Sequence, residues 1–201
     1  MDGPRRGAHH RAVPPWWLPL ALLLVMFLGD APTWRGYRER MAPSAQDAGT
    51  LRVNSALGWI AFLGGLASGA ALRGIAGLSI PPGLAWAGIG VTLAGTALRT
   101  WSIVTLGRWF TLTLQVRPDQ PVVQRGPYRV LRHPSYAGGE LALLGVGLSA
   151  GNWLSPILYV APWLVAHVHR IRIEERALLA TLGEPYRAYR ERTWRLVPFL
   201  W

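Results

Sequence analysis

The sequence predicts an all-α membrane protein: a polytopic helical bundle of about five transmembrane helices, with short cytosolic helices near its C-terminal end. Of the 201 residues, 51% are hydrophobic and only 15% are charged. The charged residues fall between long apolar runs rather than within them. Since about 20 apolar residues form one helical span, these runs are long enough to cross a bilayer.

Four runs contain no Asp, Glu, Lys or Arg, and they cover residues 12–29, 53–72, 74–98 and 141–169. The last run is too long for one helix and is interrupted at residues 152–156. We therefore predict a tight helical hairpin there. Its arms would extend back to Tyr136 and forward past Arg170, and each arm would be short or tilted.

The first run has three possible interpretations. Pro14, Pro15 and Pro19 leave an uninterrupted helix shorter than the bilayer, so this run either crosses as the first of five spans or lies in the interface. Arginines at positions 5, 6 and 11 precede it, as in a signal peptide. However, residues 28–31 lack the small-x-small pattern of a cleavage site.

The distribution of arginine predicts the orientation. All 21 basic residues are arginines, and the formal net charge is +11. With five crossings and the N-terminus outside, 16 arginines lie on the inner side and 4 on the outer side, and Arg99 lies within a span. The positive-inside rule then predicts a multi-pass cell-membrane protein with its C-terminus in the cytosol. This topology and anionic lipids account for the positive charge, so we predict no nucleic-acid partner.

Cysteine is absent, which excludes disulfides and thiolate metal sites. His167 and His169 are two residues apart on a predicted helix and point to different faces, so we predict no metal. The pairs Gly65–Gly69 and Gly147–Gly151 let helix backbones approach closely. We interpret them as packing within the chain; the oligomeric state stays open, and a monomer is favoured.

The polar segments with the clearest sequence motifs lie in the last hundred residues. Residues 126–136 read GPYRVLRHPSY, Glu174 and Glu175 follow, and residues 183–199 read GEPYRAYRERTWRLVPF. His133-Pro134 predicts a helix start, where free N–H groups can bind an anion. We expect the loop at 107–136 to face the tail at 170–201. Within the tail, residues 178–192 should form two short helices over the site.

These blocks, together with Arg99, Leu106-Gly107 and Pro198, resemble the isoprenylcysteine carboxyl methyltransferase family of integral membrane enzymes over about half the chain. The resemblance implies an S-adenosyl-L-methionine-dependent methyltransferase with a cytosol-facing cofactor pocket. Its acceptor would be lipophilic and membrane-borne, most simply an isoprenoid-type carboxylate that is O-methylated. Residues 1–201 would form one integral membrane domain, with a scaffold at 1–98 and a catalytic half at 99–201.

The resemblance also implies roles for single residues. Arg170 and Glu174 would be catalytic, and Arg170 and Arg99 would bind the acceptor. The implied cofactor-binding residues are Gln120, Pro121, Val122, Val123, Tyr128, His133, Pro134, Ser135, Tyr136 and Glu174. Because a carboxyl group with a pKa of about 4 is already ionised at neutral pH, its methylation needs no general base. Arg170 and Glu174 share a helix face, so an ion pair is the alternative to separate roles; Glu175 points away.

Other assignments stay open. Membrane sterol-type reductases that use NADPH also carry an Arg-His-Pro-x-Tyr block, although Glu174, Glu175 and the tyrosine-rich tail argue against them. A phospholipid N-methyltransferase or a non-catalytic membrane protein would retain the same scaffold. The acceptor atom could be O, S or N. Glu140 is either a functional acid or an interfacial residue that snorkels to the cytosol, and Arg99 binds a ligand or closes a structural network.

Overall fold

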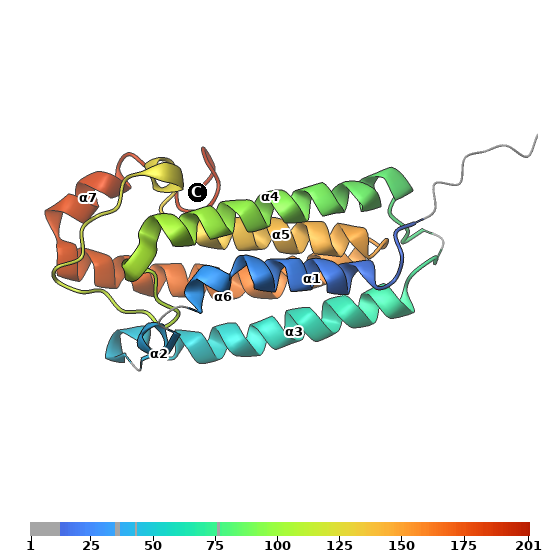
Figure 1. Ribbon diagram of the computed structural model, residues 1–201, viewed down its shortest axis with the longest axis horizontal. Coiled ribbons are helices and arrows are strands. Elements are labelled where there is room, and N and C mark those ends of the chain that lie inside the picture. The colour runs from blue at the N-terminus through green and yellow to red at the C-terminus, as the bar shows by residue number, and fades with distance from the viewer. Residues whose placement is uncertain (1–12, 35–36, 43, 76) are drawn as a thin grey trace, which may run out of the picture.

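The computed structural model describes residues 13–34, 37–42, 44–75 and 77–201, and their regular structure is helical apart from two isolated β-bridges. The long helices lie side by side along the length of the molecule (Figure 1). Arg5, Arg6, Arg11, Ala12 and Arg35, which enter the predictions for the first run and the orientation, lie outside the described residues.

Five helices build the bundle: α1 (Leu18–Gly29), α3 (Thr50–Ala71), α4 (Pro82–Leu106), α5 (Pro134–Ser149) and α6 (Leu154–Leu182). Two short helices, α2 (Tyr37–Arg40) and α7 (Glu184–Arg190), lie at one end (Figure 1). Only α3 and α4 are both long and apolar enough to pass as membrane spans by length and composition within the described residues. The all-helical class is therefore confirmed, and the count of five spans stays a prediction.

The hairpin predicted between 141 and 169 is present, with its turn at residues 150–153. Asn152 fixes this turn: its side-chain amide donates to the Ser68 carbonyl and the Ser155 hydroxyl, and its carbonyl oxygen accepts from the Ser155 N–H. The arms were predicted to be short or tilted; one is short and the other is long, and their tilt stays a prediction. Helix α5 has 16 residues, whereas α6 has 29 and continues through Pro162.

The prediction of two short helices over residues 178–192 was wrong in its first half. Residues 178–182 form the last turn of α6, and a separate helix begins only after Gly183. Gly183 has φ +61°, a left-handed conformation that glycine adopts without steric cost and that stops the helix. Only α7 is therefore a distinct helix of the tail.

Small residues let α4 and α5 pack in close contact. A Cβ atom on Gly95 would lie 2.3 Å from the Ala142 nitrogen, and one on Gly145 would lie 2.4 Å from the Thr92 nitrogen. The glycines expected from sequence also pack within the chain, because Gly65 lies against the Tyr159 ring and Gly147 against Pro156. Close backbone approach therefore holds the bundle together on two faces of α5.

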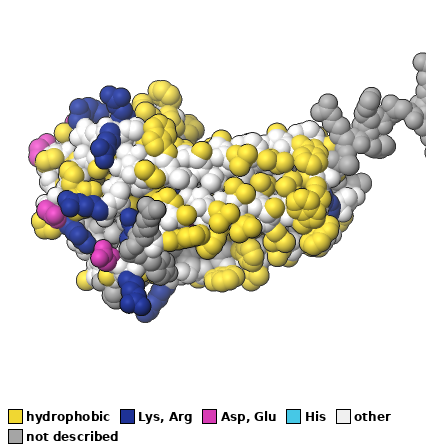
Figure 2. Space-filling view, viewed as in Figure 1, with side chains coloured by type: hydrophobic (Ala, Val, Ile, Leu, Met, Phe, Trp, Pro, Cys, Tyr) yellow, Lys and Arg dark blue, Asp and Glu magenta, His cyan; other side chains and the backbone are white. Residues whose placement is uncertain are grey.

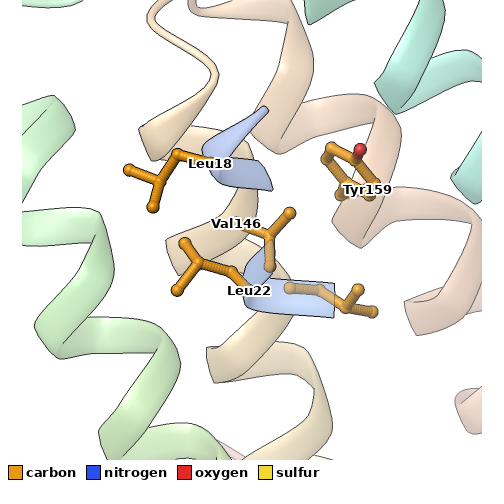
Figure 3. Packing of buried hydrophobic residues seen from close by; sticks show 5 residues of the cluster. Leu18, Leu22, Val146 and Tyr159 are labelled. Atoms are coloured by element: carbon orange, nitrogen blue, oxygen red, sulfur yellow. The ribbon is translucent and has the colours of Figure 1, made fainter. Parts of the chain in front are cut away.

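A cluster of buried apolar residues joins α1 to the hairpin formed by α5 and α6 (Figure 3). Leu18 and Leu22 of α1 pack with Leu143 and Val146 of α5 and with Tyr159 of α6. Helix α1 has 12 residues, because the chain before it contains Pro14 and Pro15. The cluster shows that α1 is part of the bundle, although it is shorter than a bilayer span.

The surface separates into two zones. Hydrophobic side chains cover the body of the bundle in Figure 2, and most of the arginine side chains visible there gather at the end that carries α2 and α7. Exposed apolar residues on the body include Trp59, Leu63, Val104, Ile157 and Val165. An apolar body with a cationic end is the pattern of a membrane-embedded bundle.

We expect Gly95→Val to destabilise the bundle strongly, because its side chain would have to displace the backbone of α5 rather than a flexible group. The expected loss is at least about 1–3 kcal/mol, measured as a lower thermal unfolding midpoint in detergent. Gly90→Val is the matched control, since it lies on the same helix and a Cβ there meets nothing within 4 Å. Equal effects at both positions would show that the α4–α5 contact is not tight.

Candidate active site

The loop before α5 and the C-terminal tail pair through their backbones at the arginine-rich end. The Arg132 N–H donates to the Trp194 carbonyl, and the Trp194 N–H donates to the Val130 carbonyl. The Tyr189 hydroxyl adds hydrogen bonds to the Tyr128 and Leu131 carbonyls. The predicted contact between the two segments is thus present, and it brings residues about 60 positions apart in sequence into one site.

Glu175 anchors this pairing. One carboxylate oxygen lies 2.7 Å from Arg132 Nε, and the other lies 3.1 Å from Arg195 Nε. His133 Nε2 lies 3.5 Å away, and Arg190 Nε lies 3.8 Å away. The Glu175 side chain is 5% exposed, against 28% for Glu174. Glu175 does point away from Arg170, as expected, but it holds the tail in place.

A first cavity lies between the loop, α6 and α7. It contains about 790 Å³ of empty space, part of which is open to solvent. Nine of the ten cofactor-binding residues implied by the resemblance line it: Gln120, Pro121, Val122, Val123, Tyr128, His133, Ser135, Tyr136 and Glu174. The tenth, Pro134, starts α5 beside them. Tyr186 and Tyr189 also line the cavity, and burial raises the pKa of each, so both phenols stay neutral.

The helix start at His133-Pro134 is present but offers fewer free donors than predicted. The N–H groups of Tyr136 and Ala137 both donate to the His133 carbonyl. Proline at position 134 has no N–H, which leaves the Ser135 N–H as the available donor of the first turn. An anion bound here would therefore need side-chain partners as well.

A second, larger cavity of about 1280 Å³ of empty space lies among the bundle helices. Its apolar lining includes Leu23, Met26, Phe27, Phe62, Leu143 and Trp163, and its polar lining includes Asp30, Asn54, Arg99, His167 and Arg170. These residues come from both sides of position 98. The division into a scaffold at 1–98 and a catalytic half at 99–201 stays a prediction. Several residues of the predicted scaffold nevertheless line this cavity.

The two cavities share a wall formed by Phe110, Thr111, Tyr136 and Arg170. Arg170 Nε donates to the Tyr136 hydroxyl at 2.9 Å, and that hydroxyl donates to Glu174 Oε2 at 2.8 Å. Among the described side chains, Arg170 and Glu174 form no direct ion pair. The Tyr136 hydroxyl connects them instead, so the alternative of a simple ion pair is wrong.

Residues from two distant parts of the chain, 47–50 and 112, hold Arg170 in position. Its guanidinium donates to the Thr50 hydroxyl at 3.1 Å and to the Leu112 carbonyl at 2.7 Å, and Asp47 lies 3.5 Å away. Burial disfavours ionisation of Asp47. Hydrogen bonds from the Leu114 and Leu51 N–H groups and the Thr50 hydroxyl, with the charge of Arg170, outweigh this and hold the pKa of Asp47 below its ordinary value. Asp47 therefore stays ionised at neutral pH.

Asp47 and Thr50 were not predicted as site residues. The sequence Asp-x-x-Thr before an apolar run indicates a helix start, and Asp47 does accept from the Thr50 hydroxyl and the Leu51 N–H. No pattern along the chain indicates the 120-residue separation between Thr50 and Arg170.

Arg99 closes a structural network. It binds Asp30 through two hydrogen bonds of 2.6 and 2.9 Å and also donates to the Ser135 carbonyl. Of the two roles considered for Arg99, the structural network is therefore present. Because Arg99 also lines the second cavity, its role toward an acceptor stays a prediction.

Glu140 does not snorkel to the interface. Its side chain is 12% exposed, and one carboxylate oxygen lies 2.7 Å from His167 Nδ1. His167 is buried and His169 is exposed, so the two histidines do point to different faces. Within the part of the chain that the structure describes, no three His, Cys, Asp or Glu residues are grouped to hold a metal ion.

Residues 88–180 match the model of the isoprenylcysteine carboxyl methyltransferase family. Protein-S-isoprenylcysteine O-methyltransferase B of Arabidopsis thaliana is 31% identical over 115 residues, which is 56% of this chain and 58% of the relative. The Schizosaccharomyces pombe protein-S-isoprenylcysteine O-methyltransferase is 29% identical over 114 residues, 56% of this chain and 48% of the relative. The match thus spans about half the length of these relatives.

The fold is also similar to a solved structure, that of a eukaryotic intramembrane Ras methyltransferase described as an isoprenylcysteine carboxyl methyltransferase. The TM-score is 0.59 at 24% identity, covering 92% of this chain and 65% of the other. This likeness supports a shared membrane fold. The family model covers residues 126–136, Glu174 and Glu175, and together with the relatives it shows that this part of the chain is similar to the isoprenylcysteine carboxyl methyltransferase family.

Proposed function

We propose that this protein is an S-adenosyl-L-methionine-dependent methyltransferase that O-methylates the carboxylate of a lipophilic, isoprenoid-type acceptor. One observation carries the proposal: the first cavity, whose lining is about half polar, and the larger, mostly apolar cavity meet at Tyr136 and Arg170. A water-soluble cofactor can enter the first cavity, and a lipid-borne acceptor can enter the second. The reacting groups would meet at the shared wall.

The residues of the first cavity suit this cofactor. Glu174 can attract its amino group or its sulfonium, and the rings of Tyr128 and Tyr136 can lie against the cation or the adenine. The Ser135 N–H can donate to the methionyl carboxylate. When bound, the cofactor supplies an electrophilic methyl group.

Arg170 is suited to hold the acceptor's carboxylate. A guanidinium has five N–H donors, and three hydrogen bonds tie Arg170 to Tyr136, Thr50 and Leu112. The remaining donors can face a carboxylate in the second cavity. Since that carboxylate is already ionised, the site has only to position it in line with the methyl group and exclude water.

The proposal is tested with the purified protein, S-adenosyl-L-methionine labelled in its methyl group, and N-acetyl-S-farnesylcysteine as the acceptor. We expect label in the acceptor that mild base releases as methanol, as a methyl ester requires. Label in a base-stable N-methyl or S-methyl group would contradict the ester assignment. Binding of NADPH but not of S-adenosyl-L-methionine would favour the reductase, although neither relative named above is a reductase.

We further propose that the arginine-rich end faces the cytosol and that α1 crosses the membrane. Because the chain has no cysteine, single cysteines at Gln124, Glu191 and Gly7 can be labelled in intact cells; Gly7 lies outside the described residues. We expect the first two to be labelled only after permeabilisation and Gly7 to be labelled from outside. Labelling of Gln124 and Glu191 from opposite sides would contradict the five-span topology, and a cytosolic Gly7 would leave four spans.

A further inference from the structure

The second cavity contains a histidine that the proposed function has not yet used. His167 is 5% exposed and lines the cavity. Its ring stacks on Tyr136, with centroids 4.5 Å apart and planes at 17°, and it also contacts Trp163. Because Tyr136 donates to Glu174 and accepts from Arg170, His167 lies one ring away from the junction of the two cavities.

The two nitrogens of His167 have different surroundings. Nδ1 shares a proton with Glu140 Oε1 at 2.7 Å. Nε2 forms no hydrogen bond within the described residues, although the side chain lines the cavity. A nearly buried ring with one nitrogen held and the other free presents that free nitrogen to a ligand.

The surroundings of Glu140 determine which form of the pair is favourable. Asp30, an acid that lines the cavity, is matched by Arg99, and Asp47 lies near Arg170. Glu140 has only His167, and its second oxygen, Oε2, is buried without a hydrogen-bond partner among the described residues. A carboxylate beside a neutral imidazole would leave a full negative charge there with one hydrogen bond, which is costly in an apolar helix interface.

The favourable state is therefore a pair with no net charge. The extra proton can lie on Glu140, which then donates to Nδ1, or on the imidazole, which then donates from Nδ1 to the carboxylate. In both arrangements Nε2 carries a hydrogen. His167 thus presents an N–H donor to the cavity.

We propose that His167, held by Glu140, is a second binding residue for the acceptor's carboxylate beside Arg170. This inference rests on the proposed function and deepens it, because it selects the acceptor class. His167 and Arg170 are three residues apart and so share a face of α6. Two donor residues that line one cavity suit an anionic oxygen acid. They disfavour a protonated amine, which Arg170 repels, and a thiol, which accepts hydrogen bonds weakly.

The test measures acceptor KM, kcat and cofactor affinity in variants. Glu140→Leu/His167→Phe replaces both polar groups by apolar ones, so neither is left unpaired, and the ring stack on Tyr136 is kept. We expect the KM for N-acetyl-S-farnesylcysteine to rise at least about tenfold, as for a lost hydrogen bond to a charged group, with cofactor affinity unchanged within about twofold. His167→Gln, whose amide can still donate, should retain more affinity. The matched control is His169→Gln, exposed and two residues away on the same helix.

An unchanged KM in the double variant would overturn the inference. A fall in kcat with no change in KM would also overturn it, because it would indicate that His167 accepts a proton from a protic substrate. A second measurement needs only the wild-type protein: S-farnesylthiopropionate, a carboxylate, should inhibit at least about tenfold more strongly than S-farnesylcysteamine, an amine. Equal or stronger inhibition by the amine would also overturn it. Absence of any wild-type methyl transfer to the carboxylate would instead contradict the proposed function itself.

Discussion

Arg170→Ala is expected to abolish methyl transfer while leaving S-adenosyl-L-methionine binding nearly intact. Arg170 lies in the wall between the cavities, and its loss would remove both the donors for the acceptor and the group that positions Tyr136. Misplacement of reacting groups by about 1 Å costs about 100-fold in rate, so we expect at least that loss in kcat/KM. Calorimetric titration with the cofactor and a labelled-methyl assay measure the two quantities.

Glu174→Ala should have the opposite profile. Glu174 lines only the first cavity, so its removal should weaken cofactor binding by about 1–3 kcal/mol, as for a lost charged hydrogen bond. Thr50→Ala serves as the control for Arg170, because it removes one hydrogen bond to the guanidinium without removing its charge. Equal losses of cofactor affinity in the Arg170 and Glu174 variants would indicate that the two residues act as one structural unit.

Glu175→Ala is expected to release the C-terminal tail from the bundle. The substitution would leave Arg132 buried without its carboxylate and would remove the partner of Arg195, and breaking a buried pair in this way costs about 3–5 kcal/mol. We expect a lower thermal midpoint and faster proteolysis after residue 183.

Glu184→Ala is the control for this prediction. Glu184 pairs with Arg187 at 3.2 Å, but its side chain is 73% exposed, so its loss should change stability little. If Glu175→Ala and Glu184→Ala behaved alike, the cluster around Glu175 would not anchor the tail. For cofactor binding, the sequence predicts a smaller loss for Glu175→Ala than for Glu174→Ala, and this stays a prediction.

The helical class and the hairpin could be predicted from sequence, because each depends on local information, and the family resemblance implied nine of the residues that line the first cavity. Apolar runs locate helices, Asn152 lies at an interruption, and residues 126–136 form a recognisable block. The exception is the junction of α6 with the tail, where helix continuation through residue 182 overrode the expected break.

The second cavity could not be predicted, because it depends on contacts between distant segments. Asp47 and Thr50 hold Arg170 across more than 100 residues, and Glu140 meets His167 only because α5 and α6 fold back on each other. Glu140 looked like a residue able to reach the interface, since it lies near the start of α5. The packing of α6 against that turn, which no periodicity reveals, keeps it inside.

The common wall of the two cavities also has a kinetic consequence for the proposed enzyme. The spent cofactor and the methylated lipid would depart in different directions, one into the aqueous phase and the other into the bilayer, so neither has to wait for the other. Product inhibition by S-adenosylhomocysteine should therefore be competitive with the cofactor and independent of how much ester accumulates in the membrane. Turnover would then be limited either by cofactor exchange at the first cavity or by lipid exchange at the second. Ester that accumulates in the membrane would slow the enzyme only by competing with the acceptor for the apolar cavity.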